Sequence, residues 1–244
     1  MKKLRRITEA EVIAEFIKGE FFHPEYDPDR ERFADIVNNP DLTNEAENAV
    51  RKAILFRRRD TMWWELPEDR QWWEIEFTPE DIDKVSVFPR AHWRKMASGD
   101  FNARHIAAEV AAQIERNDSS PFTAKMKAIR DSLAAGRNAS MIVFLGLDEN
   151  HRVTLLEGNH RFIASLLLPD GSGLENARMV AVFSPHMEQC CWYKTNFKTL
   201  FRCLKNRIKH KWDRDTDLSR LLQQTGRRPA VSASTESALP LKSK

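Results

Sequence analysis

MIVFLGLDENHRVTLLEGNHRFIASLLLPD, residues 141–170, is the stretch from which the fold can be predicted. Two apolar runs, 141–147 and 153–156, flank a polar segment and predict two short strands joined by a tight hairpin. The second strand leads directly into the pentapeptide EGNHR at 157–161, and the apolar run 162–168 then predicts a helix that stops at a proline. The order strand, hairpin, strand, glycine turn and helix is therefore expected here.

The pentapeptide has the composition of an anion-binding turn. Gly158 lies between a strand and a helix, where glycine lets the backbone approach a ligand closely. The unpaired amides at the start of a helix favour an anion. His160 and Arg161 add positive charge and a planar fork of donors. A phosphate or carboxylate site is predicted at this turn.

These residues resemble the strand–turn–helix phosphate motif of the ParB/sulfiredoxin superfamily. In that superfamily an acidic or glycine residue precedes Gly-x-(His/Arg)-Arg, and a helix with a small residue follows, here Ala164. Sulfiredoxins read Gly-Gly-Cys-His-Arg, free serine kinases Asp-Gly-His-His-Arg, and ParB proteins Gly-Glu-Arg-Arg. The resemblance covers about residues 78–185 and implies a ParB-like nucleotide-binding fold. Asn159 replaces the sulfiredoxin cysteine, so reductase chemistry is not expected.

The resemblance implies a nucleotide-dependent phosphotransferase or NTP hydrolase, with ATP, ADP or CTP as the nucleotide and Mg²⁺ as its companion ion. Arg161 would neutralise the charge of the moving phosphoryl group. His160 would bind a phosphate oxygen or transfer a proton. Glu157 would act as a base, orient Arg161 or hold Mg²⁺. The predicted catalytic residues are Glu157, His160 and Arg161, and the predicted phosphate-binding residues are Gly158, Asn159, His160 and Arg161.

Two other functions stay open. One is a non-catalytic protein that senses a nucleotide or binds nucleic acid. The other is a structural remnant in which the glycine turn serves folding only. Asp148 and Glu149 are further carboxylates one hairpin away from the pentapeptide, but a polar turn is enough to explain them.

Composition narrows the class of protein. The chain has 244 residues, of which 31% are charged and 41% hydrophobic, an ordinary globular balance. Its formal net charge is only +3, so attraction to polyanions must come from local clusters. The cysteines are few and grouped late, which favours a reducing cytoplasm over a disulfide framework. A signal peptide is not expected, because the polar segment 8–11 interrupts any apolar region after the basic start. A membrane partner is not expected either, because no apolar run approaches the roughly 20 residues that span a bilayer.

The chain is predicted to be an α+β protein, with a small mixed sheet and helices in its middle part. The expected divisions are a helical N-terminal extension at 1–77, the ParB/sulfiredoxin-like domain at 78–190, amphipathic helices at 191–225 and a disordered tail at 226–244.

A tryptophan-rich segment closes the N-terminal extension and contains Trp63, Trp64, Trp72 and Trp73. Packing of these large rings against the main domain is the favoured interpretation. A base-stacking platform beside the arginines at 57–59 is the alternative.

The helix predicted from 196 to 212 carries an apolar stripe and a basic stripe. The basic stripe could bind nucleic-acid phosphates or an acidic partner, although the solvated face of a packed amphipathic helix is the favoured interpretation. The apolar stripe is Phe197, Leu200, Phe201, Leu204 and Ile208, and the basic stripe is Lys198, Arg202, Lys205 and Lys209.

The late cysteines and His186 are of the residue types that bind zinc. Cys190 and Cys191 are adjacent, and adjacent cysteines do not match the spacing of structural zinc sites. With Cys203 they are expected to be buried, inert thiols, so no metal site is predicted from the sequence.

Overall fold

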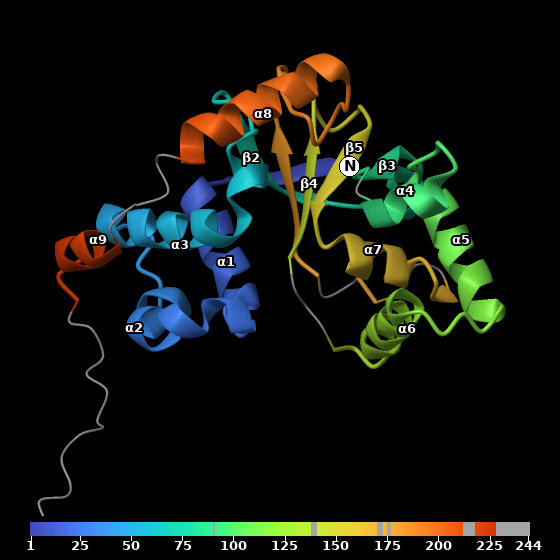
Figure 1. Ribbon diagram of the computed structural model, residues 1–244, viewed down its shortest axis with the longest axis horizontal. Coiled ribbons are helices and arrows are strands. Elements are labelled where there is room, and N and C mark those ends of the chain that lie inside the picture. The colour runs from blue at the N-terminus through green and yellow to red at the C-terminus, as the bar shows by residue number, and fades with distance from the viewer. Residues whose placement is uncertain (90, 138–140, 170–172, 175–176, 212–217, 228–244) are drawn as a thin grey trace, which may run out of the picture.

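The computed structural model describes residues 1–89, 91–137, 141–169, 173–174, 177–211 and 218–227, with the side chains of 57–61, 91–92, 209–211 and 219 outside that description. A six-stranded mixed sheet runs through the middle of the molecule, with helices on both faces (Figure 1). The strand order is β1-β2-β6-β4-β5-β3. The predicted α+β class is confirmed.

The centre of the sheet comes from the stretch 141–170. Strand β4 (Ile142–Gly146) pairs antiparallel with β5 (Val153–Glu157), so the predicted hairpin is confirmed. β4 also runs parallel to β6 (Met179–Phe183), and β5 runs parallel to β3 (Val85–Val87). β5 is thus an interior strand, and its last two residues, Leu156 and Glu157, extend past the end of β3.

The helix after β5 differs from the prediction at both ends. Helix α7 runs from Asn159 to Ser165, so it begins three residues before the predicted start at Phe162. The first turn of α7 consists of the polar residues Asn159, His160 and Arg161, so apolar periodicity does not indicate it. After Ser165 the chain tightens, because the amides of Leu167 and Leu168 each bond to a carbonyl only three residues back.

Two strands lie in the region that the sequence predicted to be helical. β1 (Lys2–Ile7) pairs antiparallel with β2 (Gln71–Glu76), and β2 pairs antiparallel with β6. The sheet therefore continues from residues 1–77 into residues 78–190. β1 carries few apolar residues, and cross-strand ion pairs such as Arg5–Glu74 hold its exposed side chains against β2.

The helices fall into two groups, one on each face of the sheet (Figure 1). Alternate residues of β4 point to opposite faces: Val143 and Leu145 join the core beneath the N-terminal helices, while Ile142 and Phe144 join the core beneath the middle helices. The N-terminal helices are α1 (Glu9–Glu20), α2 (Asp27–Asn38) and α3 (Glu45–Trp63), and the middle ones are α4 (Ala91–Ala97), α5 (Ala103–Glu115), α6 (Pro121–Ala134) and α7.

Short 3₁₀ helices and two C-terminal helices complete the description. The 3₁₀ helices are η1 (Pro24–Tyr26), η2 (Pro79–Lys84) and η4 (Met187–Gln189). Helix α8 (Phe197–Lys211) lies across the ends of the central strands, and α9 (Leu218–Gln224) packs on α3 (Figure 1). Among the helices described, none has the length and apolar character needed to cross a membrane.

The tryptophan-rich segment packs in the core. Trp63 and Trp72 are nearly fully buried, and their rings stack with centroids 5.2 Å apart. Two rings buried in this way cannot stack on nucleic-acid bases, so core packing is confirmed for this pair. The neighbouring arginine side chains at 57–59 lie outside the described residues.

The boundary of the predicted tail falls at an ordered contact. Arg227, which the sequence placed in the tail, bonds to the buried carboxylate of Glu47 at 2.6 Å and also pairs with Asp35. Residues 228–244 lie outside the described part of the chain.

Candidate functional site

A pocket of about 580 Å³ opens beside the pentapeptide. All five residues from Glu157 to Arg161 line it, so the structure brings every predicted phosphate-site residue to one cavity. The opposite walls come from the end of α1 and the segment after it, from α6, and from aromatic residues at 88, 93 and 192. The pocket therefore lies between the N-terminal region and the central sheet.

Gly158 has a conformation that favours glycine. Its φ of +82° is left-handed, and the residue caps the N-terminus of α7. A Cβ added there would lie 2.9 Å from Ile142 Cγ1. The sequence interpretation had assigned the glycine to close approach of a ligand, whereas the nearest group in the structure is a side chain of β4.

Arg161 lies in the first turn of α7 and lines the pocket. One guanidinium nitrogen donates to the carbonyl of Met141 at 3.3 Å. Burial lowers the pKa of Arg161, and the nearby carboxylates of Glu20 and Glu157 offset that effect only in part. A guanidinium in this situation gains from an anion entering the pocket. Because α7 has only seven residues, side-chain charge matters more here than the helix dipole.

His160 and Asn159 present polar groups to the same cavity. The ring of His160 lies 5.2 Å from the ring of Trp93 and 6.0 Å from that of Phe122, measured between centroids. The Asn159 amide nitrogen donates to the Leu156 carbonyl at 3.5 Å, a weak contact. Its Oδ1 is buried, and no donor in the described part of the chain reaches it. That oxygen can accept a hydrogen bond from a bound molecule.

Sequence reasoning missed three charged or titratable residues of the pocket. Glu20 and His23 come from the end of α1 and the segment after it, and Lys125 comes from α6. Each is an isolated polar residue in a segment that had shown no chemical motif. Only the fold, which sets the N-terminal region and α6 around α7, brings them to the pentapeptide.

No family model matches the chain, and neither a curated protein nor a solved structure matches it.

The carboxylates of the β4–β5 hairpin lie outside this pocket. Both oxygens of Asp148 lie 2.8 Å from Nδ1 of His151, and Glu149 pairs with Lys3 at 2.6 Å. Neither carboxylate lines the cavity. Local turn and strand contacts explain both residues.

Helix α8 packs with the opposite face from the one expected. The interpretation of a packed apolar stripe is wrong, because all five of its residues are exposed, from 49% for Leu200 to 89% for Phe197. The buried positions are instead Thr199 and Cys203, with Asn206 half-buried. The polar side of the helix therefore faces the protein.

The basic stripe of α8 is also exposed where it is described. Lys198, Arg202 and Lys205 are exposed, and Arg202 donates to the side-chain oxygen of Gln189. The side chain of Lys209 lies outside the described residues. The helix thus presents basic and apolar groups together to the outside.

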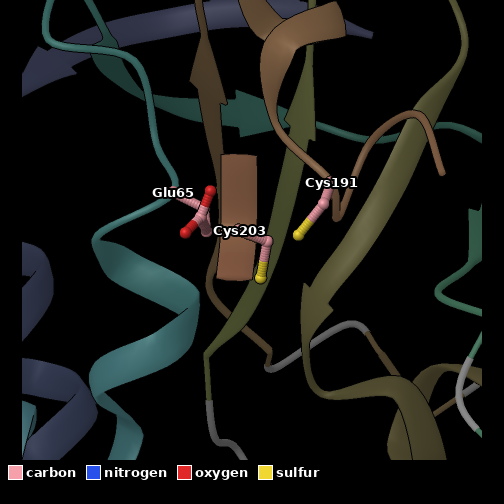
Figure 2. Close-up of side chains that lie close together, drawn as sticks. All are labelled: Glu65, Cys191 and Cys203. Carbon is pink, nitrogen blue, oxygen red and sulfur yellow. The ribbon is translucent and has the colours of Figure 1, made fainter. Parts of the chain in front are cut away.

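The cysteines are free and buried, as expected. Burial raises the pKa of the Cys190 thiol to about 12, so this thiol is unreactive at neutral pH. His186 is exposed and bonds to Asp69 at 2.7 Å, away from the thiols' buried surroundings. A different residue, Glu65, joins two of the cysteines, Cys191 and Cys203 (Figure 2).

Proposed function

We propose that the pocket at 157–161 binds the phosphates of a nucleotide and that the chain is a nucleotide-dependent phosphotransferase or NTP hydrolase. The observation that carries the proposal is the position of Arg161, a half-buried guanidinium that lines a large cavity. The resemblance of residues 157–161 to the ParB/sulfiredoxin phosphate motif supports the same assignment. ATP, ADP and CTP are the candidate nucleotides.

Three nitrogen-bearing side chains would hold the phosphates. Arg161 and Lys125 line the cavity from different elements, and His160 lies in the same turn as Arg161. Arg161 can grip two phosphate oxygens at once, whereas Lys125 acts as a point charge. The buried Oδ1 of Asn159 would accept a hydrogen bond from a hydroxyl or amine of the same ligand.

The aromatic wall suits the base of a nucleotide. Phe88 and Trp192 pack with ring centroids 4.2 Å apart, and both line the pocket. Phe22, which also lines it, is 70% exposed. Stacking on aromatic rings does not require a particular set of hydrogen bonds to the base. The lining thus combines cationic side chains with aromatic rings, the two kinds of group that bind the phosphates and the base of a nucleotide.

Two carboxylates would serve the reaction. Glu157 and Glu20 line the pocket and both act electrostatically on Arg161. Either can orient Arg161 or take a proton from an attacking hydroxyl or water. Carboxylates are also the ligands that Mg²⁺ takes, so the lining fits a magnesium nucleotide, in which the ion neutralises phosphate charge.

A thermal-shift panel of ATP, ADP and CTP, each with and without Mg²⁺, tests this function. A nucleotide at 100 times its dissociation constant should stabilise the chain by about 2.7 kcal/mol. Release of phosphate, or its transfer to an added acceptor, should follow with the stabilising nucleotide. Lack of any stabilisation across the panel would contradict the proposal.

A nucleotide-sensing or nucleic-acid-binding regulator is the second candidate. The observation in its favour is that Lys198, Arg202 and Lys205 stand exposed on one helix. Nucleotide stabilisation without turnover would select it. Binding of a DNA duplex that weakens as salt rises, and that is lost when these three residues become glutamine, would assign nucleic acid as the partner. The exposed apolar stripe beside them is not explained by phosphate binding.

A further inference from the structure

Glu65, Cys191 and Cys203 form a compact buried cluster apart from the pocket. Their carboxylate and sulfur ligand atoms all lie within 4.8 Å of one another. Each residue is at most 7% exposed, and none of the three lines the nucleotide pocket. Figure 2 shows the two thiols and the carboxylate drawn together from separate segments of the chain.

The three residues come from elements that meet only in the folded chain. Glu65 follows the end of α3, Cys191 follows η4, and Cys203 lies in the middle of α8. Cys203 belongs to the polar side of α8 that faces the protein, next to Thr199 and Asn206. The cluster is therefore the place where α8 meets both other segments.

The donor set has the chemistry of a zinc site. Thiolate and carboxylate groups are ligands of Zn²⁺, which binds cysteine sulfur at about 2.3 Å and carboxylate oxygen at about 2.0–2.2 Å. Soft thiolates select zinc over magnesium and calcium. Three protein ligands leave one tetrahedral position, which a solvent molecule can fill.

A neighbouring amide would orient one of the ligands. Asn206, one turn after Cys203 on α8, donates from Nδ2 to Oε1 of Glu65 at 3.1 Å. Hydrogen bonds of this kind to a ligating carboxylate fix its orientation. Asn206 is thus a positioning residue for the cluster rather than a ligand.

We propose that Glu65, Cys191 and Cys203 bind one Zn²⁺ ion, which fastens α8 to the end of α3. Binding forms two Zn–S bonds and one Zn–O bond, and the two thiol protons pass to solvent. No electron is transferred. The site accounts for the unusual orientation of α8, whose polar side is turned inward while its apolar stripe is exposed.

Elemental analysis and cobalt titration of the full-length protein test the site. The purified protein should contain about one zinc per chain. After removal of zinc with a chelator its melting temperature should fall, and added Zn²⁺ should restore it. Added Co²⁺ should give the absorption bands of thiolate-to-cobalt charge transfer. A wild-type chain that has no zinc and gives no such band would overturn the proposal.

Variants assign the ligands. Cys191→Ser and Cys203→Ser should lose the bound zinc and weaken the cobalt band, while Cys190→Ser, a buried thiol outside the cluster, should keep both. Equal loss of bound zinc in Cys190→Ser and Cys203→Ser would contradict the assigned ligand set. Because a serine in α8 can also disturb folding, circular dichroism must show intact helix in each variant.

Two further variants keep all the thiols of the cluster. Glu65→Gln and Asn206→Ala should each weaken zinc affinity about 10–100-fold, the usual effect of disturbing a ligand or its support. Unchanged affinity in Glu65→Gln would remove the carboxylate from the site. A freshly purified wild-type chain that mass spectrometry finds joined by a Cys191–Cys203 disulfide would also overturn the proposal.

Discussion

Gly158 packs directly against Ile142, the first residue of β4. A Cβ on residue 158 would lie 2.9 Å from Ile142 Cγ1 and 3.4 Å from its Cα, and real Cβ atoms do not come as close as the first distance. Gly158 also has φ = +82°, which side chains rarely adopt. The turn that begins the candidate phosphate site is thus fixed by the packing of the sheet beneath it.

Gly158→Ala should destabilise the fold by about 2–4 kcal/mol, the sum of left-handed backbone strain and overpacking. The matched control is Gly136→Ala, where φ is +67° but no heavy atom lies within 4 Å of the added Cβ. The control should cost only about 1 kcal/mol. Urea unfolding measures both, and equal losses would show that Ile142 moves aside.

The β4–β5 hairpin could be predicted from the sequence because two apolar runs flank a polar turn within a few residues. The strand β1 could not be predicted, because its partners Glu74 and Glu76 are far along the chain and its own residues are mostly charged. Lys125 and Glu20 were missed for the same reason. Their place in the pocket depends on how separate helices pack, and a local sequence pattern does not predict that packing.

The orientation of α8 also could not be predicted from the sequence. A helical sequence fixes which residues share a face, and the apolar and basic stripes are both present in the structure. The sequence does not fix which face turns inward. Here the buried Thr199 hydroxyl donates to the Lys194 carbonyl at 2.7 Å and accepts from the Asn196 amide at 3.0 Å. Both partners precede the helix, so these contacts cap the N-terminus of α8 and satisfy the buried hydroxyl.

Substitutions on α8 should therefore have effects opposite to those of an ordinary amphipathic helix. Phe201→Gln should change the free energy of unfolding by no more than about 0.5 kcal/mol, because the ring is 65% exposed. Thr199→Val, nearly equal in volume, should cost about 0.5–2 kcal/mol because it removes the hydroxyl that caps the start of the helix. Urea unfolding compares the two, and a larger loss for Phe201→Gln would mean that the apolar stripe is covered in solution.

Acid should weaken the contact between α1 and the segment before β2. Glu9 accepts hydrogen bonds from Arg70 at 2.6 Å and Lys52 at 3.1 Å. Burial alone would raise the pKa of Glu9, but Arg70 and Lys52 together lower it below its ordinary value of 4.5. The stabilisation is therefore present above pH 4.5 and is lost as the pH falls through the lowered pKa.

Glu9→Gln should cost about 1.5–3 kcal/mol at pH 7, the range for hydrogen bonds to a charged group. The difference from wild type should shrink in acid, where wild-type Glu9 is itself neutral. Glu31→Gln, an exposed position on α2, is the control and should match wild type at each pH. Urea unfolding across the acid range gives the profile, and a difference that grows on acidification would reverse the assigned sign.

Arg161 should be needed for ligand binding but not for folding. Burial lowers the pKa of Arg161 because the carboxylates of Glu20 and Glu157 do not fully offset its loss of solvent. Replacing it with a flexible apolar residue, Arg161→Met, should leave the free energy of unfolding unchanged or raise it by up to about 1 kcal/mol, as is common for residues kept for function. The same variant should lose the thermal stabilisation by nucleotide.

Arg161→Lys separates charge from geometry, since lysine keeps the charge but lacks the planar fork. If Arg161 holds two phosphate oxygens, nucleotide affinity measured by calorimetry should fall by about 1–3 kcal/mol while the fold stays intact. Arg104→Lys, an exposed arginine on α5 that pairs with Asp83, is the control and should bind as wild type does. Asn159→Ala should weaken binding less than Arg161→Lys, because it removes one neutral acceptor. Normal nucleotide binding by Arg161→Met would show that the phosphates lie elsewhere, and the resemblance at 157–161 would then have no functional meaning.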